Sequence, residues 1–349
     1  MPNSNHQIKP LTSIRFFAAF FVMLSHLEFL RNTNLSFLSI DEGYASVTLF
    51  FILSGFVLSY SYQNRLLNKE TLISKFYVAR IARVYPIHII TFLITILLLP
   101  IANNSFRYYF YNITLIQAYI PSDKYYFDFN AVSWSLSVEM FFYLLFPFLI
   151  KFRNRYLILI TLFLLTIKII NPFEAIGKTH AFLYIFPLFR LPDFIIGILL
   201  YRIRKKYTFA SIPSLTSLYQ IVSVMILIIF MLLLKKVNIS YRYDIYHIIP
   251  MALIIYSFSF SNGVLGKCLS NKFLVILGES SFSLYMIHQL VIRYMINRVG
   301  LENLNWKLPV SMILISIVLS LFMFEYLETP LKNIIMNVFN RLFFKKYRE

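Results

Sequence analysis

The chain has 349 residues, of which 59% are hydrophobic and 14% charged, with a mean hydropathy of +0.69 and a net charge of +18. A soluble domain carries about 25% charged residues, so the composition excludes an ordinary soluble protein and indicates a polytopic membrane protein. The positive charge fits loops beside anionic lipid better than nucleic acid, because no basic soluble domain exists to bind it. The single cysteine, Cys268, excludes an internal disulfide and a cysteine-based metal site.

Apolar segments long enough to cross a bilayer recur along the chain. The sequence predicts an all-α, polytopic integral membrane protein with about ten transmembrane helices, in a single domain over residues 1–349. A basic amphipathic cytoplasmic tail, residues 331–349, should lie on the inner leaflet. The first segment is too long for a signal peptide's apolar region, so we expect it to be retained. The expected spans are 11–30, 45–63, 84–102, 131–150, 155–171, 182–201, 214–234, 245–261, 274–297 and 308–327.

The lysines and arginines between these spans predict the orientation. If the N-terminus is cytoplasmic, the inner segments hold 20 of these residues and the outer segments hold 10. Cytoplasmic loops of membrane proteins carry the excess of positive charge. We therefore expect both termini to be cytoplasmic.

The first span, LTSIRFFAAFFVMLSHLEFL, carries two ionisable residues, Arg15 and His26. They are eleven residues apart, about three helical turns, so they share nearly one face. An ionisable residue inside a span is a functional hypothesis by default. We take His26 as the reacting group.

The second span has Ser54 and Gly55 at its middle. Glycine lets a neighbouring helix approach closely, and serine can bond across helices. Taken alone, ordinary small-residue packing is the favoured interpretation.

The segment FYVARIARVYP leads into the third span and places Arg80 and Arg83 on one helix face. Two adjacent guanidinium groups suit phosphate. Taken alone, the segment slightly favours two anchors that reach the lipid headgroups.

The segment WSLSVEMFFY opens the fourth span and places Ser135 and Glu139 on one face. A buried carboxylate needs a partner. Glu139 and His26 are both expected in the outer half of the membrane, so they can meet. The alternative is a structural pair with another buried cation.

Three later motifs carry further polar groups. Arg190 and Asp193 are spaced to neutralise each other within one helix, so we predict a structural pair. Ser281, Tyr285 and His288 fall on one face of the ninth span, although a lone helix histidine is more often structural. Glu325 and Glu328, in FEYLETP, are expected on one face near the cytoplasm.

In order along nearly the whole chain, these motifs resemble the membrane acyltransferase-3 family, which O-acylates bacterial cell-surface glycans. The resemblance is carried by Arg15 to His26, FFILSGFVLSY, RIARVYP, WSLSVE, RLPDFIIG, GESSFSLYMIHQ and ETP. It implies the stand-alone form, without the extracytoplasmic SGNH hydrolase-like domain that some members carry. The chain lacks the arginine doublet common before the RxxR position.

The resemblance implies roles for single residues. His26 is similar to the essential histidine that activates the acceptor hydroxyl, with Arg15 as its essential arginine. Arg80 and Arg83 match the RxxR that binds the acyl donor, commonly acyl-CoA, from the cytoplasm. No permanently bound cofactor and no metal are expected; acetyl-CoA is the expected co-substrate.

These readings combine in one hypothesis, in which His26 takes the proton of a glycan hydroxyl and Glu139 orients the imidazole. Ser54 is a candidate oxyanion donor. Tyr85 joins the donor-site candidates, and Trp134, Ser137, Tyr285 and His288 are candidates for acceptor binding. The expected location is the bacterial cytoplasmic membrane.

Two other classes stay open. A lipid-linked glycosyltransferase often has acidic residues in its first outer loop, where Asp41 and Glu42 lie. A polysaccharide flippase or exporter would also be basic and polytopic, but it should show repeated halves, and the sequence shows none.

Overall fold

The computed structural model describes residues 7–31, 33–34, 36, 43–100, 105–206, 212–300 and 305–344. These residues are mostly helical and include no strand, which confirms the predicted all-α class. The helices are α1 (Lys9–Ser25), α2 (Tyr44–Leu58), α3 (Asn64–Leu67), α4 (Ile73–Leu98), α5 (Phe106–Ile113), α6 (Asp123–Tyr126), α7 (Trp134–Leu149), α8 (Asn154–Ile170), α9 (Pro187–Lys206), α10 (Pro213–Leu233), α11 (Ile239–Arg242), α12 (Ile245–Phe258), α13 (Val264–Leu269), α14 (Lys272–Glu279), α15 (Ser281–Val299), α16 (Lys307–Met323) and α17 (Thr329–Phe344).

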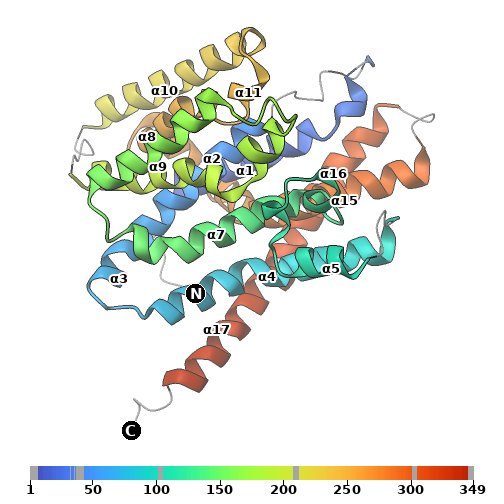
Figure 1. The fold of residues 1–349 in the computed structure, drawn as a ribbon, viewed down its shortest axis with the longest axis horizontal. Coiled ribbons are helices and arrows are strands. Elements are labelled where there is room, and N and C mark those ends of the chain that lie inside the picture. Colours follow the sequence, from blue (N-terminus) through green and yellow to red (C-terminus); the bar gives the residue numbers. More distant parts are fainter. Residues whose placement is uncertain are drawn as a thin grey trace.

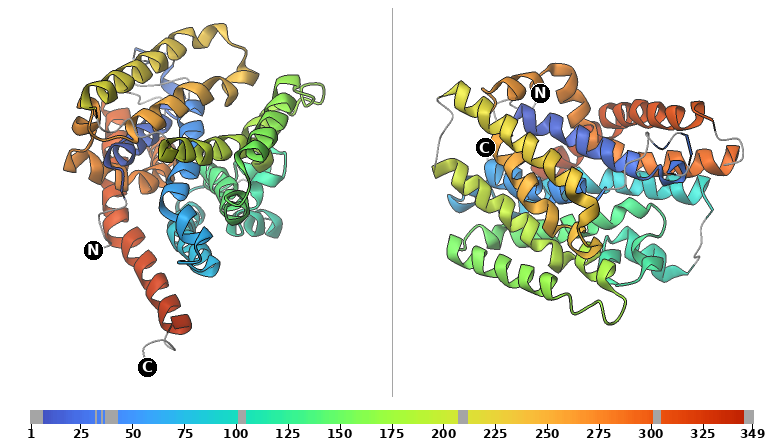
Figure 2. Two further views of the ribbon diagram at one scale, coloured as in Figure 1. Left: turned by 90° about the vertical axis from the view of Figure 1, so that its left-hand side faces the viewer. Right: turned by 90° about the horizontal axis from the view of Figure 1, so that it is seen from above.

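The long helices pack into one bundle, with α3 at one end and α5 at the other (Figure 1). The last helix, α17, leaves the bundle and projects away from it (Figure 2). Along α17 the apolar side chains of Ile334, Val338 and Leu342 are exposed on one face. This pattern fits the amphipathic tail that the sequence predicts.

The outer helices turn their polar residues inward and their apolar residues outward. In α10 the buried side chains are Thr216, Gln220 and Ser223, whereas Leu232 is 77% exposed. The same arrangement recurs in α16, where Ser316 is buried. Water would oppose this inside-out distribution and a bilayer favours it.

Five described helical segments are long and apolar enough to cross a membrane, and a sixth qualifies if the bent pair of α14 and α15 counts as one span. The five segments are Tyr44–Leu67, Ile73–Leu98, Ala131–Leu149, Pro213–Lys236 and Lys307–Phe343. The chain is therefore a helical protein with several segments suited to spanning a membrane, and the total of ten spans stays a prediction.

Two predicted boundaries differ in the structure. The first helix ends at Ser25, and a 3-10 turn follows that buries Leu27 and Leu30 while Glu28 stays exposed. The predicted span 274–297 is two helices, α14 and α15, bent by 60°. Before this bend α14 lies directly on α1, since a Cβ on Gly278 would overlap the carbonyl group of Thr12.

A close approach joins α2 and α9 through two glycines. A Cβ on Gly55 would overlap the carbonyl oxygen of Phe194, and one on Gly197 would overlap that of Ile52. Only glycine leaves the backbones room at such a crossing. The small-residue packing predicted for Gly55 is confirmed.

We expect Gly55→Ala to lower the free energy of unfolding by about 1–3 kcal/mol, because the added methyl group meets backbone that cannot rotate away. Gly43→Ala is the matched control, since its Cβ would meet only the rotatable side chain of Ser25. Thermal unfolding in detergent compares the two variants. Equal midpoints for Gly55→Ala and wild type would contradict the proposed tight crossing.

Candidate active site

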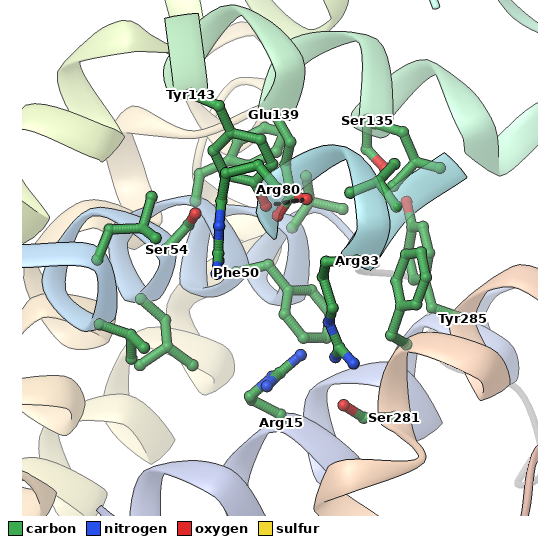
Figure 3. Close-up of a pocket in the computed structure, with 18 residues that line it drawn as sticks. Arg15, Phe50, Ser54, Arg80, Arg83, Ser135, Glu139, Tyr143, Ser281 and Tyr285 are labelled. Carbon is green, nitrogen blue, oxygen red and sulfur yellow. Dashed lines mark hydrogen bonds between the residues drawn. The ribbon is translucent and has the colours of Figure 1, made fainter. Parts of the chain in front are cut away.

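A cavity of about 140 Å³ lies between α1, α2, α4, α7 and α15 (Figure 3). We call it the first cavity. Much of its wall is apolar, including Phe50, Phe51 and Leu136. It also brings together predicted site residues from five helices, namely Arg15, Ser54, Arg80, Arg83, Glu139 and Tyr285.

Three guanidinium groups line this cavity. Arg15 comes from α1, and Arg80 and Arg83 come from α4; Figure 3 shows the three side chains reaching into the space from opposite sides. Because both α4 arginines line the interior, the interpretation of this pair as headgroup anchors is not supported. The site has the donor groups that hold phosphate or carboxylate oxygens.

Arg83 is held by a carboxylate from the other end of the sequence. Its Nη1 forms an ion pair with Glu328, which is buried and also accepts a hydrogen bond from the Ser283 hydroxyl at 2.7 Å. Glu328 was not among the predicted site residues. A regular helix would place Glu325 and Glu328 on one face. In the structure a π-helical turn spans Phe324–Glu328, so that Glu325 is exposed and Glu328 is buried.

Arg15 and Arg80 differ from Arg83, because within the described residues no carboxylate lies at ion-pair distance from either. The Arg80 guanidinium lies 5.1 Å from the ring centroid of Tyr62 and donates to its hydroxyl at 3.2 Å. These contacts position the cation without neutralising it. Arg15 and Arg80 are therefore the groups best placed to bind an anion.

Glu139 faces this cationic group rather than a histidine. Its carboxylate accepts a hydrogen bond from the Tyr143 hydroxyl at 2.8 Å and attracts Arg15, Arg83 and Arg80 electrostatically. The expected pairing with His26 does not occur among the contacts of the described residues. The physical reason is that the guanidinium groups occupy the polar surroundings of Glu139.

His26 instead stacks on His288. The ring centroids lie 5.2 Å apart with 14° between the planes. His288 Nδ1 donates to the Leu284 carbonyl oxygen at 3.1 Å, because a carbonyl can only accept, and this fixes the neutral tautomer. His288 Nε2 is buried without a hydrogen-bond partner among the described groups, so it can accept a proton.

Tyr285 lies between the first cavity and this histidine pair. It lines the cavity, its ring centroid is 6.0 Å from that of His288, and its hydroxyl donates to the Val132 carbonyl oxygen at 3.3 Å. Ser135 also lines the cavity and bonds the same carbonyl oxygen at 3.0 Å. The start of α7 and the start of α15 are thus joined beside the histidines.

The remaining candidates are placed elsewhere. Trp134 and Ser137 are buried in the core and are not among the described residues that line the first cavity; Trp134 packs on Tyr184 at 4.7 Å. Tyr85 is also absent from that lining, and its hydroxyl donates to the Thr114 carbonyl oxygen at 3.4 Å. The structure brings none of these three to the cavity.

The predicted structural pair of Arg190 and Asp193 is confirmed by an ion pair of 2.8 Å. Both side chains are fully buried, and Lys168 and Asp244 extend the cluster with a second ion pair. Asp41 and Glu42, on which the glycosyltransferase alternative rests, lie outside the described residues. The described residues contain no group of three or more His, Cys, Asp or Glu placed to hold a metal ion.

We expect Arg83→Ala to destabilise the protein by about 3–5 kcal/mol, because it leaves the buried Glu328 carboxylate unpaired. The double variant Arg83→Ala/Glu328→Gln should regain part of that loss. Arg80→Ala is the matched truncation that removes no ion pair, so it should cost less. Thermal unfolding in detergent measures all three, and a double variant no more stable than Arg83→Ala would contradict this account.

Comparison with known proteins shows the family of the chain. The family model described as "Acyltransferase domain", acyltransferase-3, matches residues 10–325. The chain is 27% identical to "Acyltransferase MdmB" of Streptomyces mycarofaciens, over 84% of this chain and 81% of that protein. It is 27% identical to "Putative acetyltransferase ORF330" of Acidianus two-tailed virus, over 80% and 82% of the two chains.

It is also 25% identical to a "Putative O-acetyltransferase" of Staphylococcus aureus strain COL, over 83% of this chain. This match spans 53% of the Staphylococcus protein, about half its length. No solved structure is significantly similar to the chain. Since the family model covers most of the sequence, the chain belongs to the acyltransferase-3 family and is an O-acyltransferase.

Proposed function

We propose that this protein moves an acyl group from cytoplasmic acyl-CoA to a hydroxyl group of a cell-surface or lipid-linked polysaccharide, with His26 as general base. The observation that carries the proposal is the first cavity: three guanidinium groups on apolar walls, beside a stacked histidine pair. Guanidinium groups can bind the phosphates of a donor, and a histidine can take the proton of a hydroxyl group.

The charges of the cavity support acyl-CoA as donor. Glu328 offsets Arg83 and Glu139 offsets one further cation, so the three arginines leave one positive charge in excess. Arg15 and Arg80 are free of ion pairs within the described part of the chain and would hold phosphate oxygens. The apolar wall would take the acyl chain, and the names of the relatives make acetyl the first candidate.

The chemical step would balance as follows. His26 takes the hydroxyl proton while the hydroxyl oxygen forms a bond to the acyl carbon. The carbon–sulfur bond of the thioester then breaks, and the CoA thiolate leaves and takes up a proton from the imidazolium. His288 packs against His26 and would hold its ring in place during both transfers.

We further propose ten spans, cytoplasmic termini and the cytoplasmic membrane as location. Contacts between elements support this topology, because the segments expected inside the cell lie at one end of the bundle. Arg202 bonds the Ile150 carbonyl oxygen, and Lys205 bonds Asn64. Arg204 bonds Ser259.

A deletion strain tests the function. The surface glycan should lose its O-acyl groups on deletion, regain them with wild type, and stay unmodified with His26→Gln, whose loss of base should reduce transfer by about 100-fold or more. His180→Gln is the matched control, since the His180 ring packs on Tyr184 and Tyr243 and, among the described ring contacts, touches neither His26 nor His288. Unchanged glycan acylation on deletion would overturn the proposal, and full rescue by His26→Gln would remove His26 as base.

The orientation can be tested without a new cysteine. Cys268 is the only cysteine and is exposed, on the loop expected inside the cell. A membrane-impermeant maleimide should leave it unlabelled in intact spheroplasts and label it in inverted vesicles. Labelling in intact spheroplasts would reverse the proposed topology.

A further inference from the structure

A second cavity, of about 230 Å³, lies against the part of α15 that follows His288. It is lined by the end of α4, the segment before α7, and the middle of α15. The side chains used below are Thr95, Phe127, Asp128, Phe129, Gln289 and Arg293. A cavity of about 150 Å³ already admits a six-membered ring, so this one has room for a ring that carries substituents.

The two cavities follow one another along two helices, α4 and α15. On α4, Arg83 lines the first and Thr95 the second, about 18 Å further along the helix. On α15, Tyr285 lines the first, and Gln289 and Arg293 line the second. His288 lies between Tyr285 and Gln289 in sequence, and its ring centroid is 6.0 Å from that of Tyr285, so the histidine pair lies beside the stretch of α15 that the two cavities share.

The two cavities differ in charge. The first holds three arginines, whereas Arg293 and Asp128 in the second attract each other and balance. A polyanion such as CoA would gain little electrostatic attraction in the second cavity, because its charges balance. A balanced carboxylate and guanidinium, with an amide and two phenyl rings nearby, suits a neutral ligand that carries several hydroxyl groups.

The backbone of the second cavity is held in an uncommon conformation. Phe129 has φ of +53°, in the left-handed region. Its N–H donates to Asp128 Oδ1 at 3.0 Å, and its carbonyl oxygen accepts from Arg293 Nη1 at 2.6 Å. Strain of this kind persists where surrounding contacts fix it, and it gathers at binding sites.

Gln289 gives the cavity an unused acceptor. Its Oε1 is buried and has no hydrogen-bond partner among the described groups. Leaving a buried acceptor unsatisfied costs free energy. A ligand hydroxyl that donates to Gln289 would remove that cost.

We propose that the second cavity binds a sugar ring of the acceptor, with Asp128 and Gln289 accepting from its hydroxyl groups. Arg293 then donates to the carbonyl oxygen of Phe129 and balances the negative charge of Asp128. This inference rests on the proposed function, since it names where that function's acceptor binds. It divides the protein into a donor cavity and an acceptor cavity, with His288 between their lining residues along α15.

The test uses the full-length protein in membrane vesicles, radiolabelled acetyl-CoA, and glycan purified from the deletion strain. Gln289→Leu and Asp128→Asn should each raise the glycan KM by about tenfold, the value of one lost hydrogen bond to a buried group. The acetyl-CoA KM should stay within about twofold, which also reports correct folding. Asp123→Asn, the same change at an exposed position nearby, should alter neither KM.

A second measurement does not depend on turnover. Gln289→Cys in a Cys268→Ser background should react with impermeant maleimide from the outer face, and added glycan should slow the reaction. An unchanged glycan KM in both variants, or a thiol that glycan does not protect, would overturn the acceptor cavity. Failure of the proposed function looks different, because the deletion strain would then keep all its O-acyl groups.

Discussion

The first cavity holds charged side chains inside an apolar protein interior. The ion pair of Arg83 with Glu328 makes this burial possible, because it neutralises one of the three arginines. Three guanidinium groups in one small space repel each other, and repulsion between charges grows as the surroundings exclude water. Glu328 reaches Arg83 from the turn between α16 and α17, so the end of the last long helix is tied to the start of α4. Glu139 offsets a second cation from α7. What remains is a small positive excess at Arg15 and Arg80, and Tyr62 holds the Arg80 guanidinium in place.

Sequence reasoning predicted the parts of this site that are unusual by themselves. An arginine or a glutamate inside an apolar span stands out, which is why Arg15 and Glu139 were found. Arg80 was found from its i, i+3 spacing with Arg83 before the third span, and the structure brings these residues to one cavity. The helical class, the glycine crossing at Gly55 and the local pair of Arg190 with Asp193 depend on composition or on neighbours in one helix, and the structure confirms them.

Partners set by tertiary packing could not be predicted in the same way. The side chain of Glu328 is buried because a π-helical turn changes its direction. A regular helix, as expected from the sequence, would place it on the same face as the exposed Glu325. His26 follows the last residue of α1, so a helix extended to residue 30 gave it the wrong surroundings. Its stacking on His288 joins residues 262 positions apart, and Glu139 is satisfied by Tyr143 and by arginines. Each of these outcomes depends on which helices touch, and a single sequence does not carry that information.

The stacked histidines bear directly on the proposed proton transfer. With centroids 5.2 Å apart in an apolar interior, two imidazolium ions would repel strongly, so the pair can hold one added proton at a time. The Leu284 carbonyl oxygen fixes the proton of His288 on Nδ1 and leaves Nε2 as an acceptor. In the proposed step His26 takes one hydroxyl proton and returns it to the leaving thiolate, so the pair would never need to hold more than that one proton. Neither histidine is among the described residues that line the first cavity, and Tyr285 both lines that cavity and contacts His288, so the positive charge proposed to bind phosphate would be kept apart from the groups that must stay neutral to act.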